Sequence, residues 1–171
     1  FSKVKKGPII FFGNEFFDAI PIKQFLYEKN SLLEKCYKIN PNLGLNEAYQ
    51  AASCEDVAKI KTFKVLKGLK FIEYPKLGFI ELDKIVKKIN EQTGGILLID
   101  YGYVNIINRS TLQTVMKNKK MDINNLFKNL GESDITSLVN FSLLEEYFKK
   151  KKIKGQKGCF SKVFLRKNGN N

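Results

Sequence analysis

The chain has 171 residues, a length typical of one domain, and 43% of them are hydrophobic, which suffices for an ordinary buried core. It contains no histidine, which excludes Ser-His-Asp and Cys-His catalysis and every histidine-ligated metal site. Its cysteines, Cys36, Cys54 and Cys159, form no CxxC pair, so a zinc ribbon and a thioredoxin-type motif are also excluded. The sequence has no GxGxxG or GxxxxGKS/T loop, and no apolar run approaches the ~20 residues of a membrane helix.

The 30 basic and 17 acidic residues give a formal net charge of +13, which raises the question of nucleic-acid binding. Only Arg109 and Arg166 are arginine, the residue that base readout and bidentate binding of phosphate favour. The lysines are spread over every segment, as in a general compositional bias. Composition therefore favours a solvated basic surface in a reducing compartment, with a nucleic-acid face or an anionic membrane surface as alternatives.

The first half of the chain reads mainly as strands. Residues 8–12 are a continuous aromatic and β-branched run, typical of a strand buried on both faces in a parallel sheet with helices on either side. Residues 22–27 and 32–39 flank a polar turn and predict a hairpin. Residues 46–61 are predicted to form a helix, and residues 69–74 a short strand that ends before a proline.

The second half begins with the clearest helix, residues 79–92, whose apolar positions share one face and which Gly94 ends. A buried strand follows at 96–99, and a helix followed directly by such a strand is half of a βαβ unit. The remaining expected elements are short helices at 110–117 and 122–129 that begin at Ser110 and Asp122, an extended segment at 135–139, an amphipathic helix at 141–151, a last strand at 157–166 and a frayed tail at 168–171.

Polar clusters follow both buried strands, where ligands bind in open α/β sheets. Asn14, Glu15 and Asp18 follow the first strand, and this amide with two carboxylates is suited to a cationic substrate, because carboxylates accept bidentate bonds from guanidinium. Asp100 and its neighbours up to Tyr103 follow the second strand.

A structural interpretation of the same residues stays open. Asp18 and Asp100 can cap turns, while Tyr101 and Tyr103 can pack at the edge of the sheet. Between these tyrosines, Gly102 would permit a positive φ. Segment 131–136 can turn the chain or bring Asp134 toward the same rim.

Four segments in one order resemble the MidA-like methyltransferases, bacterial proteins with a mitochondrial branch. GPIIFFGNEFFDAIPIKQF resembles the family's NEFFDALP segment, and GGILLIDYGY resembles the strand that follows it. STLQTV resembles DTLQAV, and GESDITSLVNF resembles GEADLTAHVDF, except that Asn140 replaces an aspartate. The KGCFSKVFLRKN segment near the end resembles the family's QGxFL ending only loosely.

The resemblance implies an α/β, class I methyltransferase-like (Rossmann-like) sheet with helices on both faces, incomplete at the N-terminus. Residues 8–12 would be its fourth strand and residues 96–99 its fifth, parallel and adjacent. Residues 1–171 would form the C-terminal portion of a single methyltransferase domain, without the upstream cofactor-binding half. That half would carry the glycine-rich loop and the ribose-binding acid, so this chain alone is expected to be inactive and to bind the cofactor weakly.

The resemblance also implies roles for residues. Asn14, Glu15 and Asp18 would be catalytic, and Gly13 with Asn14 would contact the cofactor, S-adenosylmethionine. The substrate-binding set would be Asp100, Tyr101, Tyr103 and Asp134, and no metal is expected. Glu15 would pair with one side of a substrate guanidinium and leave the far nitrogen more nucleophilic for an in-line displacement.

The expected function of the parent protein is S-adenosylmethionine-dependent methylation of protein arginine, linked to assembly of respiratory complex I. The implied partner is a protein substrate such as a complex I subunit, and a homodimer is considered, without specific nucleic acid or membrane insertion. The compartment would be the bacterial cytoplasm, or the mitochondrial matrix in a eukaryote. The alternatives are a non-catalytic assembly or interaction module that retained the fold and, more remotely, a basic nucleic-acid-associated domain.

Overall fold

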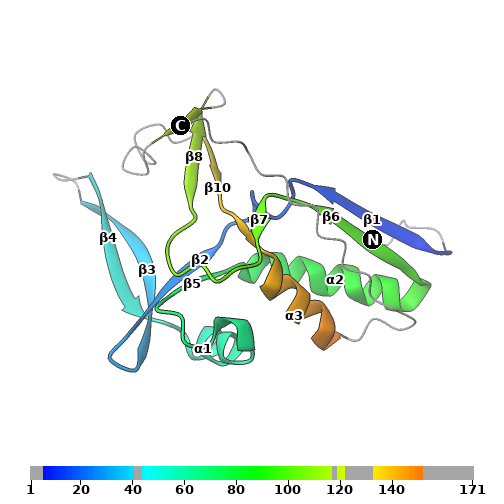
Figure 1. The fold of residues 1–171 in the computed structure, drawn as a ribbon, viewed down its shortest axis with the longest axis horizontal. Helices are drawn as coiled ribbons and strands as arrows, with labels where there is room; N and C mark the ends of the chain where they lie inside the picture. The colour runs from blue at the N-terminus through cyan, green and yellow to red at the C-terminus, as the bar shows by residue number, and fades with distance from the viewer. Residues whose placement is uncertain (1–5, 41–43, 117–118, 122–132, 152–171) are drawn as a thin grey trace.

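The computed structural model describes residues 6–40, 44–116, 119–121 and 133–151 (Figure 1). This part of the chain contains both helices and strands, and its strands form four separate small sheets. The elements are β1 (Ile9–Asn14), β2 (Lys23–Glu28), β3 (Ser31–Asn40), β4 (Gly44–Ala51), α1 (Cys54–Lys61), the 3-10 helix η1 (Lys64–Leu66), β5 (Phe71–Tyr74), α2 (Lys76–Gln92), β6 (Gly94–Ile99), β7 (Gly102–Tyr103), β8 (Gln113–Met116), β9 (Lys119–Met121), β10 (Asp134–Thr136), β11 (Val139–Asn140) and α3 (Phe141–Lys151).

The strands β1 and β6 pair in parallel, as the sequence analysis predicts, and α2 runs along one face of the pair (Figure 1). Their register runs from Ile9 opposite Gly94 to Asn14 opposite Ile99, so both strands end at the same level. Gly94 has a φ of +133°, and a side chain there would begin 1.7 Å from the Ile9 carbonyl oxygen. Glycine therefore lets β6 start beside β1 directly after α2.

The two faces of the β1–β6 pair differ. Ile96 and Leu98 pack against the hydrophobic core, whereas Ile10, Phe12 and Leu97 are 80%, 65% and 51% exposed. The alternation follows from the period of two along a strand. The expected arrangement, with helices on both faces of a Rossmann-like sheet, is therefore not confirmed, because one apolar face is open in the described part of the chain.

The hairpin predicted in the first half is confirmed as β2 and β3, which belong to a four-stranded antiparallel sheet in the order β4-β3-β2-β5. Lys29 and Asn30 join the two strands with φ values of +46° and +64°. Positive φ at both central residues matches the right-handed twist of the strands. The strand predicted at 69–74 is confirmed as β5, which pairs with β2.

The helix predicted over 46–61 is wrong in its first half. Residues of β4 pair with β3 along the whole strand, and only α1 is helical. The helix begins late because the Ser53 side chain accepts a hydrogen bond from the Asp56 amide at 3.1 Å and caps it. Pairing with the preceding strand β3 outweighed the local preference for helix.

The helix predicted over 110–117 is also wrong. Ser110 does not cap a helix, because its hydroxyl accepts hydrogen bonds from the Gln24 side chain and the Leu112 amide. The following residues form β8, which pairs antiparallel with β9 and β10. The extended segment at 135–139 is confirmed by β10 and the start of β11. The elements expected at 122–129, 157–166 and 168–171 lie outside the described residues.

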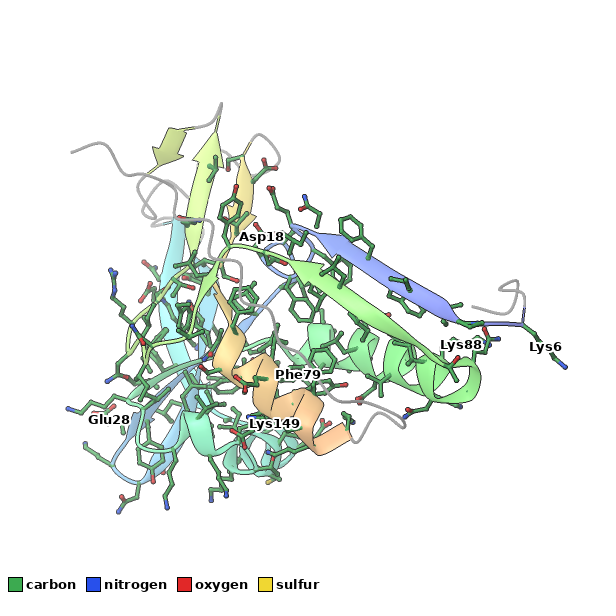
Figure 2. The ribbon with its side chains drawn as sticks, turned by 45° about the vertical axis from the view of Figure 1, so that its right-hand side comes forward. Lys6, Asp18, Glu28, Phe79, Lys88 and Lys149 are labelled. Atoms are coloured by element: carbon green, nitrogen blue, oxygen red, sulfur yellow. The ribbon has the colours of Figure 1, made fainter. Side chains whose placement is uncertain are left out.

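The helices predicted at 79–92 and 141–151 are confirmed as α2 and α3, and an aromatic stack joins them (Figure 2). The rings of Phe79 on α2 and Tyr147 on α3 are nearly parallel, with centroids 4.6 Å apart. Phe63 stacks on the other side of Phe79 at 5.5 Å. None of the helices in the described ranges is long and apolar enough to span a membrane.

One fully buried carboxylate ties α1 to its neighbours. Asp56 meets Lys23 of β2 at 2.8 Å and Lys76 of α2 at 2.9 Å. Burial acts to raise the pKa of Asp56, but the two lysines and the Ser53 hydroxyl outweigh it and lower the pKa to about 2. The pair of lysines therefore keeps α1 fixed against the sheet and α2.

Two phenylalanines at opposite extremes of burial test this packing. We expect Phe25→Ala to lower the free energy of unfolding by about 3–5 kcal/mol, because Phe25 is completely buried. Phe12→Ala should cost about 0.5 kcal/mol, since its ring is 65% exposed. Urea unfolding of both variants measures the difference. Similar losses would mean that the open face of β1 and β6 is covered in solution, contrary to the structure.

Candidate active site at the ends of β1 and β6

The loop after β1 begins where the two parallel strands end. Asn14 lies opposite Ile99, and the Glu15 amide donates to the Ile99 carbonyl at 2.8 Å. Glu15 has a φ of +49°, which turns the chain away from the strand direction. The loop therefore starts from a fixed point, directly beside the first residue after β6, and Figure 2 marks its position by Asp18.

That first residue, Asp100, is bonded to the loop backbone. One carboxylate oxygen accepts hydrogen bonds from the amides of Phe16 at 3.1 Å and Phe17 at 2.7 Å, and the other accepts from the Asp18 amide at 3.3 Å. Asp100 is only 3% exposed. Burial raises the pKa of this carboxyl, while the three amides act in the opposite direction. Its oxygens thus face the loop, not the solvent.

Phe17 anchors the same loop to the core. Its ring is 3% exposed and lies against Gly78 of α2, where an added Cβ would approach the ring to 2.6 Å. Phe16 makes an edge contact with Phe17 but stays 39% exposed at the rim. One aromatic ring therefore fixes the loop from below, while the other remains available at the surface.

A third segment closes the loop from the side. The Ser137 amide donates to the Asp18 carbonyl at 2.9 Å, and the Val139 amide donates to the Tyr101 carbonyl at 2.9 Å. The short strands β7 and β11 then pair in parallel, with Gly102 opposite Val139. A side chain at Gly102 would begin 2.1 Å from the Val139 carbonyl oxygen. This close approach of two backbones explains why residue 102 is a glycine. The positive φ expected there is wrong, because Gly102 is not among the glycines with a positive φ.

A fourth segment joins through Thr111. Its hydroxyl accepts from the Leu138 amide at 3.0 Å and donates to a carboxylate oxygen of Glu73 at 2.6 Å. The Thr111 amide donates to the other Glu73 oxygen at 2.9 Å, as does the Gln24 side chain at 2.8 Å. Glu73 on β5 thereby connects the four-stranded sheet to the site. Glu73 was not among the residues predicted for the site. The feature of the sequence that could have indicated it is its position as the single acid in the otherwise apolar strand β5.

The candidate catalytic residues lie together on this loop. Asn14 and Glu15 are exposed at the rim, and Asp18 is half-buried. Burial raises the pKa of the Asp18 carboxyl, and the carboxylates of Asp100 and Glu15 act in the same direction. Gly13 is half-buried, and an added Cβ would lie 3.0 Å from the Leu98 side chain, so inward packing accounts for this glycine.

The candidate substrate-binding residues are less uniformly placed. Tyr101 and Tyr103 are half-buried next to the loop. The pKa of Tyr103 is raised to about 12, mainly by burial and to a smaller extent by the nearby charge of Glu73. Asp134 is exposed on β10, opposite Val115 in a different sheet from β1 and β6. The structure thus groups the tyrosines with the loop, whereas Asp134 belongs to a neighbouring sheet.

A small pocket lies beneath the loop. Its lining includes Phe17, Glu73, Tyr103 and Asn140, and its volume of about 20 Å³ suits a water molecule. A cofactor or a substrate side chain is larger than this. On the exposed side of the loop, Asn14 and Glu15 supply an amide and a carboxylate to a larger ligand.

The described residues contain no group of three His, Cys, Asp or Glu side chains that could hold a metal ion. The rim carries the exposed carboxylate of Glu15 and the exposed amide of Asn14. The loop backbone beside them is bound by Ile99, Asp100 and Ser137. Such an arrangement can orient a ligand and stabilise positive charge. The site is therefore suited to positioning chemistry.

Comparison with known proteins gives one family match and several related structures. Residues 1–157 match the family model described as putative S-adenosyl-L-methionine-dependent methyltransferase. The chain is 25% identical over 143 residues to protein arginine methyltransferase NDUFAF7, mitochondrial, from Danio rerio. This alignment covers 84% of the chain and 33% of that relative, so the chain spans about a third of the relative's length.

Two crystal structures from Burkholderia thailandensis have the same fold over 85% of the chain, at 18% identity. One is an uncharacterised protein with a TM-score of 0.63, and the chain covers 40% of it. The other is described as a likely methyl transferase bound to S-adenosyl-homocysteine, with a TM-score of 0.61 and 38% coverage. The family model confirms the family resemblance found in the four sequence segments, and the two structures show the shared fold.

A matched pair of glycine variants tests the junction of β7 and β11. We expect Gly102→Ala to lower the free energy of unfolding by about 1–3 kcal/mol, because its methyl group overlaps the Val139 carbonyl. Gly95→Ala should change it by about 0.5 kcal/mol or less, since an added Cβ there meets nothing within 4 Å. Urea unfolding compares the two. Equal stability of both variants would show that β7 and β11 do not approach as described.

Proposed function

Because this chain belongs to the family of putative S-adenosyl-L-methionine-dependent methyltransferases, we propose that it supplies the acceptor side of a methyl-transfer site. The observation that carries the proposal is that family-like segments distant in sequence bind the loop at residues 14–18, which itself lies in the first of them. Asp100 and Ser137 bind the loop backbone directly, and Thr111 binds the Leu138 amide next to Ser137. Their hydrogen bonds fix the loop backbone, while Asn14 and Glu15 stay exposed. The activity of the whole protein is part of this proposal, since the chain spans only a fraction of its relatives' length.

The bound cofactor would supply an electrophilic methyl group on a sulfonium. Asn14 fits a role in holding it, because its side chain is exposed where the paired strands end. Gly13 can contribute its backbone, although inward packing already explains its lack of a side chain. The chain's own contribution to such a displacement is to position the acceptor, exclude alternative orientations and stabilise charge.

The finer proposal is that the acceptor is a protein arginine. The exposed carboxylate of Glu15 can pair with one side of a guanidinium and draw positive charge toward itself. Asp18 and Asp100 add negative charge behind it. The far nitrogen would then attack the methyl carbon while the carbon–sulfur bond breaks, so that the donor leaves as a neutral thioether and the nitrogen loses its proton to solvent. The name of the Danio rerio relative supports arginine, and the further link to complex I assembly rests on the family resemblance alone.

The second candidate is a non-catalytic interaction module that retained the fold. The specific observation in its favour is the open apolar face that carries Ile10, Phe12 and Leu97. Exposed apolar patches of this kind mark contact surfaces in soluble proteins. The two candidates differ in one measurable property, which is transfer of a methyl group by the intact protein.

A methyl-transfer assay tests the proposal. The protein as its gene encodes it would be incubated with methyl-labelled S-adenosylmethionine and with peptides that differ only in carrying arginine or lysine. We expect label on the arginine peptide alone. Glu15→Gln should lower kcat/KM about tenfold or more, because one charge-assisted hydrogen bond is lost.

Glu28→Gln is the matched control, since Glu28 is an exposed carboxylate in the hairpin turn region and should leave kcat/KM unchanged. Label on the lysine peptide would overturn the assignment to arginine. Absence of transfer to either peptide by a folded protein that binds the cofactor would favour the interaction module.

A further inference from the structure

We propose that Asp100 is a positioning residue of the methyl-transfer site, which acts by fixing the backbone of the loop that presents Asn14 and Glu15. The effect of Asp100 on catalysis rests on the proposed function. Its effect on the shape of the loop does not. The positioning role differs from the role that the resemblance implies for Asp100, which is direct binding of the substrate.

The number and direction of its hydrogen bonds indicate that Asp100 shapes the loop. Three consecutive amides, from Phe16 to Asp18, point at one carboxylate that lies more than 80 positions later in the chain. Consecutive amides converge in this way only when the backbone curls around the acceptor. Asp100 therefore determines the shape of the loop, and not merely its attachment.

The burial of Asp100 keeps a substrate away from its carboxylate. Asp100 is 3% exposed, and each of its oxygens is already engaged by loop amides. A substrate could reach this carboxylate only after the loop had opened. The exposed carboxylate of Glu15 is therefore the one available to a ligand, and Asp100 acts through it.

Glu15, which precedes the amides that bind Asp100, has an unusual backbone conformation. Its positive φ is uncommon for a residue with a side chain, and it persists only where the surroundings enforce it. The Ile99 carbonyl binds the Glu15 amide on one side, and Asp100 binds the next amides on the other. Together these bonds fix the direction in which the Glu15 side chain leaves the rim.

The structure also indicates that the loop would stay attached without the Asp100 charge. The Asp18 carbonyl still accepts from Ser137, and Phe17 still packs on Gly78 of α2. An asparagine at position 100 has nearly the same shape but carries one NH₂ group, a donor that would face loop amides that are also donors. Asp100→Asn should therefore loosen the loop without unfolding the domain.

The experiment measures the loop and the reaction in the same protein. Amide hydrogen exchange followed by NMR should be about tenfold or more faster at Phe16, Phe17 and Asp18 in Asp100→Asn than in the unmodified protein. The amide of Ile72 in β5 should not change. Glu28→Gln is the control for loss of a carboxylate elsewhere. Unchanged exchange at the loop amides would overturn the proposal.

A double-mutant cycle then separates positioning from a general structural role. If Asp100 acts through Glu15, the fold-losses in kcat/KM of Asp100→Asn and Glu15→Gln should not multiply in the double variant. Multiplicative losses would overturn the positioning role, because a merely destabilising change would act independently of Glu15.

Failure of the proposed function is distinguishable from failure of this inference. If the unmodified protein transfers no methyl group, both the proposed function and the catalytic role of Asp100 are refuted. Faster exchange at the three amides in Asp100→Asn would still support the fixing of the loop by Asp100, and unchanged exchange would refute it.

Discussion

The carboxylate of Asp100, bonded to three successive amides of the loop after β1, is the interaction on which the site depends. It exists because β1 and β6 are parallel and end at the same level, which places the first residue after β6 beside the loop after β1. The cost of burying a carboxylate is offset by the donors around it. The local shape of the loop therefore follows from the pairing of two strands distant in sequence.

Two further connections extend this arrangement into the rest of the fold. Ser137 binds the loop from the side, and Thr111 links the neighbouring segment to Glu73 on the four-stranded sheet. Below the loop, α2 receives the Phe17 ring. The exposed side chains at the rim are thus supported by a loop whose backbone binds Ile99, Asp100 and Ser137 and whose Phe17 ring packs on α2. Rigid support of this kind is what catalysis by positioning requires.

Local patterns in the sequence predicted the elements whose residues interact mainly with near neighbours. The hairpin of β2 and β3 and the helices α2 and α3 are of this kind. The strands β1 and β6 pair with each other across a long stretch of chain, but their continuous apolar runs marked them as strands. The segments at 46–61 and 110–117 were assigned wrongly, since pairing of β4 with β3, and of β8 with β9 and β10, decides their structure and outweighs their local patterns. Asp100 was expected at the site, but its amide partners could not be inferred, because they lie more than 80 positions earlier in the chain. Glu73 was visible only as a single acid in an otherwise apolar strand. The apolar run of β1 suggested burial on both faces, whereas one face is open.

We propose that the methyl donor and its acceptor meet at the rim formed by residues 13–18 and 100–103. Titration of the isotope-labelled 171-residue chain with S-adenosylhomocysteine, followed by NMR, tests it most directly. We expect weak binding, with a Kd of about 1 mM or above, because this chain has no glycine-rich phosphate- or nucleotide-binding loop motif. The shifted amides should concentrate in those two segments. Shifts confined to the sheet of β2 to β5, with none in the rim, would contradict the account.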